Sequence, residues 1–151
     1  PMRLADRTDY ALRVLLVVGA RQGRISVPEL AERLAVSASH LAKVVQDLQH
    51  AGWVATTRGH SGGVEFIADP DRLTVGEVAR RLEPEGGVVE CLRDGGDCVL
   101  SPACRLRSIL VDATEAFFRH LDEVTLADLL RGRRTQVLRA VGITRSGDGP
   151  S

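Results

Sequence analysis

Apolar residues recur at helical spacing through the first fifty residues of the chain. They predict a first helix that begins at Thr8 and ends at Gln22 and Gly23. Residues 26–29 read Ser-Val-Pro-Glu, a capping box with proline in the first turn, so a second helix begins there. After a break of about three residues, Ser37 begins a third helix with the apolar stripe Leu41, Val44, Val45 and Leu48. Two helices joined by so short a turn predict a helix-turn-helix.

The pattern changes from helical to alternating directly after the third helix. Residues 53–57 and 64–67 predict two strands, and residues 58–63 predict the turn between them, which is rich in glycine and contains Arg58. A helix-turn-helix followed by a hairpin with a basic tip is typical of a winged helix. We therefore expect residues 1–68 to form a winged helix-turn-helix domain.

This arrangement predicts a DNA-binding surface. A helix in the major groove needs short polar side chains that reach the base edges, and a wing beside the phosphates needs arginine and a close backbone. A solvated helix face is the alternative interpretation of the same polar positions. The candidate DNA-binding residues are Ser37, Ser39, His40, Lys43, Arg58, His60 and Ser61.

The second half of the chain predicts a long helix between shorter segments. Residues 69–100 are expected to hold a short helix that begins at Thr74 and a polar loop, and residues 101–131 a long helix and a short one. Ser101 and Pro102 are suitable residues for the start of the long helix. Its length of about 30 Å is more than we expect the rest of the chain to cover. A second copy would cover it, so the fold class is mainly α and homodimeric; packing against its own domain is the alternative. We expect a disordered tail over residues 132–151.

Composition and charge restrict the kind of protein. The chain has 151 residues, of which 44% are hydrophobic, enough for a core. It contains no apolar run long enough to span a membrane and opens with no secretory signal, so we expect a cytoplasmic location. The formal net charge is zero, but residues 1–63 contain eight basic against five acidic side chains. A nucleic-acid surface is therefore expected in the first third.

All three cysteines, Cys91, Cys98 and Cys104, lie in the polar loop and at its end. An odd number does not suit disulfides, and the Cys-x2-Cys pair of structural zinc sites is absent. The wider spacing suits a larger body such as an iron–sulfur cluster, whose negative charge Arg93, Arg105 and Arg107 could offset. A zinc site and a redox-active thiol switch stay open as alternatives. No histidine or acid is spaced to activate these thiols, so we do not expect an enzyme.

Several stretches resemble the Rrf2 family of winged-helix transcription regulators, over the course of residues 2–130. The resemblance is carried by residues 2–4 and 8–13, by residues 39–41 and 51–54, by the glycine-rich wing and by the cysteine-containing loop before a long helix. Within the family, the chain most resembles the nitric-oxide-sensing iron–sulfur repressors. The family's cluster-biogenesis regulators have a histidine three residues after the third cysteine, where this chain has Arg107.

The resemblance implies a specific site and function. It implies a 4Fe–4S cluster held by the three cysteines and by a carboxylate on the first helix of the partner subunit, where Asp9 is the matching position, with Arg13 nearby. Asp9 could instead stabilise its helix end and pair with Arg13. The implied function is a homodimeric repressor that binds an inverted-repeat operator and releases it when nitric oxide damages the cluster. A regulator with a 2Fe–2S cluster that responds to redox state or iron supply, and a zinc-stabilised DNA-binding regulator, are the alternatives.

Overall fold

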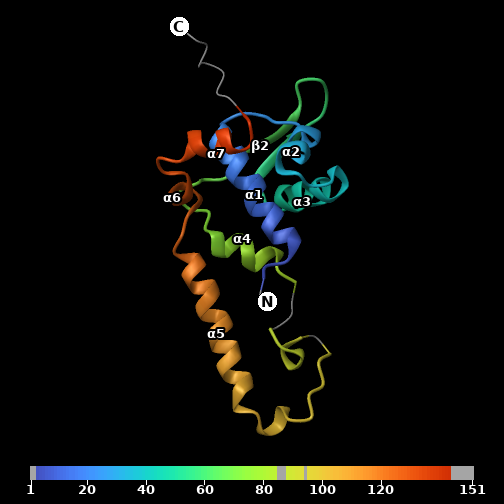
Figure 1. The fold of residues 1–151 in the computed structure, drawn as a ribbon, viewed down its shortest axis with the longest axis vertical. Coiled ribbons are helices and arrows are strands. Elements are labelled where there is room, and N and C mark those ends of the chain that lie inside the picture. The colour runs from blue at the N-terminus through green and yellow to red at the C-terminus, as the bar shows by residue number, and fades with distance from the viewer. Residues whose placement is uncertain (1–2, 85–87, 94, 144–151) are drawn as a thin grey trace.

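The computed structural model describes residues 3–84, 88–93 and 95–143 and is mainly helical (Figure 1). The winged helix is confirmed: three helices are followed by a two-stranded antiparallel sheet. The elements, in chain order, are α1 (Asp6–Arg21), α2 (Val27–Leu34), α3 (Ala38–His50), β1 (Val54–Thr57), β2 (Gly63–Phe66), α4 (Val75–Leu82), the 3-10 turns η1 (Glu90–Leu92) and η2 (Ser101–Ala103), α5 (Arg105–Asp122), α6 (Leu126–Leu130) and α7 (Arg134–Ala140).

Helix α1 is the centre of the hydrophobic core. It contacts α3, α4, α6, α7 and β2, and α3 buries its predicted stripe in the same core. We call these elements together with α2 and β1 the head. The predicted N-cap serines of α2 and α3 are also confirmed: the Ser26 hydroxyl accepts from the Glu29 amide at 3.2 Å and the Ser37 hydroxyl from the His40 amide at 3.3 Å. The reciprocal bond of the predicted capping box, from the Ser26 amide to Glu29, is not formed among the described residues.

The wing is attached to the head by its second strand. Val54 pairs with Phe66 and Thr57 with Gly63. The Ile25 amide donates to the Val64 carbonyl at 3.1 Å, and the Val64 amide donates to the Ile25 carbonyl at 2.7 Å. Gly63 has a φ of 149°, and a Cβ there would lie 2.5 Å from the Ile25 carbonyl oxygen. Glycine is therefore required where the wing approaches the chain before α2.

Two predicted helix starts are wrong. Helix α1 begins at Asp6, and Thr8 is buried in its first turn rather than capping it. A carboxylate from elsewhere in the chain assists this start, because the Ala5 amide donates to Glu83 Oε1 at 2.9 Å. The long helix begins at Arg105, since residues 101–103 form a separate 3-10 turn and Cys104 has an extended backbone that interrupts the helix.

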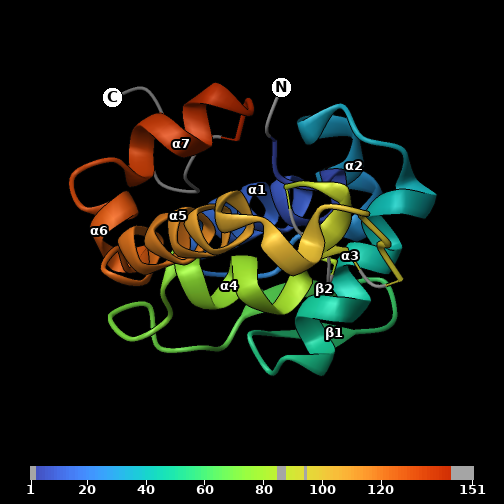
Figure 2. The ribbon, with the colours of Figure 1, turned by 90° about the horizontal axis from the view of Figure 1, so that it is seen from below.

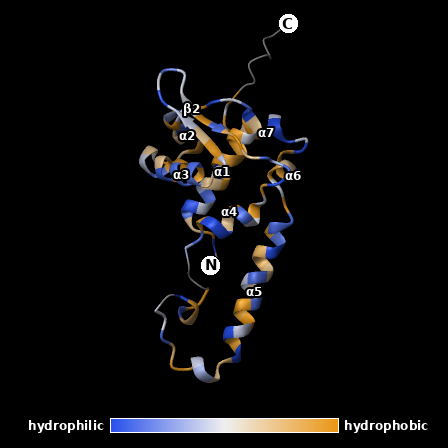
Figure 3. Ribbon diagram, turned by 180° about the vertical axis from the view of Figure 1, so that it is seen from behind, coloured by the Kyte–Doolittle hydropathy of each residue, from blue (hydrophilic) through white to orange (hydrophobic). Residues whose placement is uncertain are grey.

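Helix α5 projects from the head, with the segment that contains the cysteines beside it (Figures 1 and 2). We call residues 88–104 the cysteine loop, of which residue 94 is not described. No described residue of α5 is buried, and the exposed fractions are 57% for Leu106, 60% for Ile109 and 37% for Phe117. Figure 3 shows apolar residues along this helix, outside the head. As expected, this single chain leaves much of the apolar surface of α5 exposed.

The expected disorder from residue 132 onward is wrong for residues 134–143. Helix α7 contacts α1, and Leu138 and Ile143 are buried, because the few apolar residues of this segment converge on the head. The Arg33 guanidinium donates to the Gly142 carbonyl at 2.8 Å and adds a polar attachment. The expectation for residues 144–151 falls outside the described residues.

Candidate functional site

The candidate DNA-binding residues of α3 lie on its exposed side. Ser37 is the N-cap, and Ser39, His40 and Lys43 follow on the first two turns, all exposed. The hydroxyls of Ser37 and Ser39 lie 3.5 Å apart. Within the described residues, Lys43 forms no ion pair. The buried stripe faces the core, so the opposite face of α3 presents small hydroxyls, an imidazole and one ammonium group to solvent.

The wing tip presents a second set of polar side chains. Arg58, His60 and Ser61 are exposed on the turn between β1 and β2. Gly59 has a φ of 104°, and the Gly62 amide donates to its carbonyl at 3.1 Å, which makes the turn tight. Helix α3 and the wing lie on one side of α1, and α6 and α7 on the other (Figures 1 and 3). The structure therefore places both predicted sets on the same side of the head.

Two carboxylates near these surfaces are paired with arginines. Asp47 on α3 accepts from Arg7 Nε at 2.6 Å, and Glu65 on β2 lies 3.5 Å from Arg24 Nε. In each pair, the arginine offsets the negative charge of the carboxylate. No sequence pattern indicated these arginines, because each pair joins residues about forty positions apart.

The three cysteines lie at separate points of the cysteine loop. Cys91 is in η1, Cys98 follows the Gly95 and Gly96 turn, and Cys104 is the N-cap of α5. All three are free thiols and partly exposed. The 3-10 turn η1, which contains Cys91, contacts α5. Over residues 3–84, 88–93 and 95–143, no three His, Cys, Asp or Glu side chains converge as they would around one metal ion.

The cysteine loop is folded back on itself by backbone hydrogen bonds. The Gly96 amide donates to the Arg93 carbonyl at 2.9 Å, and the Ser101 amide to the Cys98 carbonyl at 2.9 Å. A Cβ at Gly96 would overlap the Glu90 carbonyl, so glycine is required there. Arg93 and Arg105 are exposed, and no ion pair is formed by either within the described part of the chain.

Asp9 is partly exposed on α1 and is paired with Arg13. Arg13 Nε donates to Asp9 Oδ1 at 3.0 Å, and the same guanidinium lies 5.7 Å from the centre of the Tyr10 ring. The side chain of Asp9 is 42% exposed. In this single chain, the structure therefore shows the ion pair and does not join Asp9 to the thiols.

A second connection that no sequence pattern indicated joins the head to α5. Arg80 on α4 donates to Glu115 Oε1 at 2.8 Å and to Asp122 Oδ2 at 2.9 Å, and lies 5.0 Å from the centre of the Phe118 ring. The hydrogen bond from Arg80 lowers the pKa of Glu115, and both carboxylates raise the pKa of Arg80. Glu115 and Asp122 are seven residues apart, a spacing that places both on one face of a helix.

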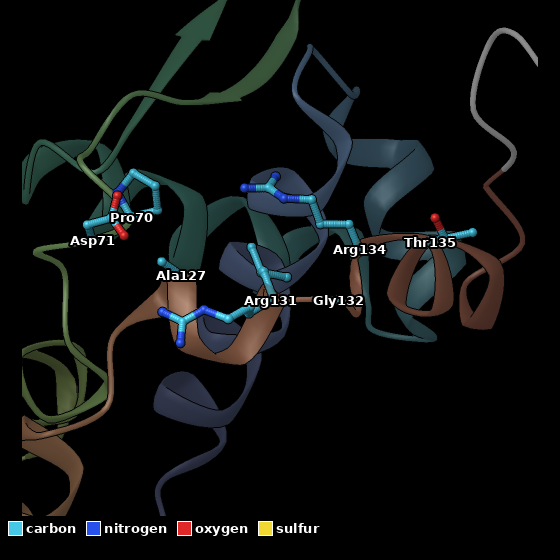
Figure 4. Close-up of a pocket in the computed structure, with 8 residues that line it drawn as sticks. Pro70, Asp71, Ala127, Arg131, Gly132, Arg134 and Thr135 are labelled. Carbon is cyan, nitrogen blue, oxygen red and sulfur yellow. The ribbon is translucent and has the colours of Figure 1, made fainter.

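A hollow of about 400 Å³ lies elsewhere, between residues 70–71 and the turn from α6 to α7 (Figure 4). Its two arginines already have partners: Arg131 donates to Asp128 Oδ1 at 3.0 Å, and Arg134 donates to the Gly19 carbonyl. The hollow lies on the side of α1 away from α3 and is separate from the candidate site.

Comparison with known proteins decides the family. A model of the Rrf2 family, described as "Iron-dependent Transcriptional regulator", matches residues 4–132. The chain belongs to the Rrf2 family. It is 42% identical over 135 residues to the HTH-type transcriptional regulator NsrR of Geobacillus kaustophilus. This match covers 87% of this chain and 92% of the relative. It is 39% identical to the regulator of the same name from Bacillus subtilis, with the same two coverages.

A solved structure supports the same assignment for this Rrf2 chain. The crystal structure of a putative transcriptional regulator from Listeria innocua matches with a TM-score of 0.70 and 27% identity, over 86% of this chain and 87% of that one. The Rrf2 chain is thus a DNA-binding transcription regulator of winged-helix fold, and not an enzyme. Among the described helices, none combines the length and the hydropathy needed to cross a membrane.

Proposed function

We propose that this Rrf2 regulator is a homodimeric repressor that senses nitric oxide through an iron–sulfur cluster. Its ligands are Cys91, Cys98 and Cys104 of one protomer and Asp9 of the partner subunit. The observation that carries the proposal is the set of three free, partly exposed thiols on one loop that ends at the start of α5. The description of the family as iron-dependent and the name NsrR of two relatives support the proposal.

The donor set fits a 4Fe–4S cluster. Thiolates are the usual ligands of iron–sulfur clusters, and the N-cap position of Cys104 favours its thiolate through the helix dipole. Arg93 and Arg105, exposed and close to the cysteines in sequence, offset the negative charge of such a site. A carboxylate is a harder ligand than a thiolate, so Asp9 gives the most easily broken of the four bonds. A bound cluster supplies iron sites at which nitric oxide reacts.

A second copy completes the assembly. The exposed apolar residues of α5 need a partner, and a second α5 has the same stripe. In such a dimer, two copies of α3 read inverted half-sites whose spacing the dimer sets. The hydroxyls of Ser37 and Ser39, the imidazole of His40 and the ammonium of Lys43 contact bases or adjacent phosphates.

The wing makes the sequence-independent contacts. Arg58, His60 and Ser61 lie at its tip, where the glycines let the backbone approach the phosphates. With a cluster bound, Asp9 would attach α1 to the partner subunit, and loss of this attachment would release α1. Because α1 contacts α3, the dimer conformation that places both copies of α3 for DNA binding would then be less populated, and the DNA affinity would fall.

An Asp9→Asn variant tests the ligand assignment, with Asp6→Asn as its matched control. Asp6 lies on the same turn and is exposed, with only a 3.9 Å ion pair to Arg3. We expect Asp9→Asn to change the anaerobic absorption spectrum of the cluster and the nitric oxide concentration that releases a duplex selected from a random-sequence pool. Asp6→Asn should match the parent in both. If Asp9→Asn also matches the parent, Asp9 is not a ligand.

A regulator that responds to iron supply or redox state through a 2Fe–2S cluster is the second candidate function, and the description "iron-dependent" favours it over a zinc-stabilised regulator. The iron and sulfide content of each protomer distinguishes a 4Fe–4S protein, a 2Fe–2S protein and a zinc-stabilised protein. A 2Fe–2S protein whose DNA affinity follows reduction, and not nitric oxide, would replace the proposal.

A further inference from the structure

The first turn of α1 is attached to two other parts of the head. At its start, the Ala5 amide donates to Glu83 Oε1 at 2.9 Å. Glu83 is the C-cap of α4, and the chain continues from it toward the cysteine loop. This hydrogen bond therefore joins the start of α1 to the end of α4, the last helix before the cysteine loop.

The second attachment joins α1 to the reading helix. Arg7 Nε donates to Asp47 Oδ2 at 2.6 Å, and the Asp47 side chain is only 23% exposed. Asp47 lies four residues after Lys43 on α3, so the two are neighbours along that helix. Among the described residues, this is the only ion pair between α1 and α3.

Arg7 and Asp9 leave α1 on different sides. Two residues along an α-helix correspond to a rotation of about 200°. Thr8, between them, is fully buried in the head, whereas the Asp9 side chain is 42% exposed. One helical turn thus presents Arg7 to α3 and leaves Asp9 accessible to another protomer. Because a helical turn moves as a unit, a force on Asp9 also acts on Arg7.

We propose that Arg7 is a positioning residue for DNA recognition: its ion pair with Asp47 holds α3 in the orientation that α1 sets. This role rests on one part of the proposed function, namely that the partner subunit binds α1 at Asp9. Arg7 itself contacts no base. It makes the position of α3 depend on the position of the turn that carries Asp9.

The experiment compares Arg7→Ala and Arg7→Lys with the parent, in cluster-loaded and cluster-free forms. For each protein in each form, the affinity for a selected duplex and for a random duplex is measured at two salt concentrations. Arg7→Ala should lower the affinity of the loaded form for the selected duplex by about three- to fivefold, as expected for loss of a surface ion pair. Its affinity for the random duplex and its absorption spectrum should match the parent. Arg7→Lys should restore most of the loss.

Arg3→Ala is the matched control, because Arg3 carries the same charge just before α1 and, within the described residues, pairs with Asp6 and not with α3. It should leave the ratio of selected to random affinity unchanged. In the double variant Arg7→Ala/Asp47→Ala, the ratio of selected to random affinity should fall no further than in Arg7→Ala alone, because both substitutions remove the same ion pair.

A different result would overturn the proposal. If Arg7 only screens Asp47 from phosphates, Arg7→Ala weakens both duplexes equally, more strongly at low salt, and Asp47→Ala then restores the affinity. Failure of the proposed function is separately visible, because the parent's loaded and cluster-free forms would then bind the selected duplex equally. Even in that case, an unchanged ratio of selected to random affinity in Arg7→Ala rejects the positioning role.

Discussion

At the scale of single residues, short sequence signals indicated the candidate DNA-binding residues. The contacts that position these residues join parts of the chain that are far apart in the sequence. Ser37 was identifiable because a serine before an apolar stripe is an N-cap signal, and the structure confirms its hydrogen bond to the His40 amide. The Arg7–Asp47 pair was not predictable, because nothing local relates residues forty positions apart. The same holds for Glu83, whose carboxylate accepts from the Ala5 amide.

Arg58 offers a direct test of the wing. Its guanidinium is exposed at the tip of the hairpin, where it can contact a phosphate. We expect Arg58→Ala to weaken binding to selected and random duplexes by a similar factor, and to reduce the salt dependence of binding by about one ion. The measurement is DNA affinity against salt concentration, with Arg131→Ala, directly after α6, as the control. An unchanged slope would remove Arg58 from the contacts.

At the scale of elements, the sequence predicted where most helices lie and failed where tertiary contacts decide. The apolar stripe of α3 identified that helix, because burial and helical period agree there. Helix α7 was missed because its few apolar residues form no clear stripe, and packing against α1 stabilises it instead. The start of α5 was misplaced because Ser101 and Pro102 form a separate 3-10 turn.

The contact between α4 and α5 should depend on pH. The pKa of Glu115 is lowered by its hydrogen bond from Arg80, so the ionised form favours the folded state. This stabilisation is complete at neutral pH and is lost as pH falls through the lowered pKa of the folded state. We expect Glu115→Gln to lower the melting temperature at neutral pH, and the difference from the parent to shrink toward about pH 3.

Glu123→Gln is the control for this pH dependence, since Glu123 is exposed at the end of α5 and forms no ion pair within the residues described. Thermal unfolding followed by circular dichroism across the pH range measures both variants. A Glu115→Gln difference that stays constant down to pH 3 would contradict the role given to the Arg80 pair.

At the scale of the whole molecule, the exposed stripe of α5 predicts self-association. Ile109 is 60% exposed on a helix of which no described residue is buried. We expect Ile109→Glu to convert a dimer into a folded monomer that binds the inverted-repeat duplex at least tenfold more weakly, because the second half-site is lost. Sedimentation measures the mass. Leu129→Glu on α6 should stay dimeric, and a dimeric Ile109→Glu would contradict this interface.

The account depends most on what the three thiols hold. The direct measurement is the iron, sulfide and zinc content of the chain purified without air, together with its absorption spectrum, for the parent and for Cys98→Ser. The parent should contain about four irons and four sulfides per protomer, with the broad visible absorption of a cluster, and Cys98→Ser should lose most of both. A colourless parent that contains zinc, or no metal, would contradict the proposal and leave a winged-helix regulator without this sensor.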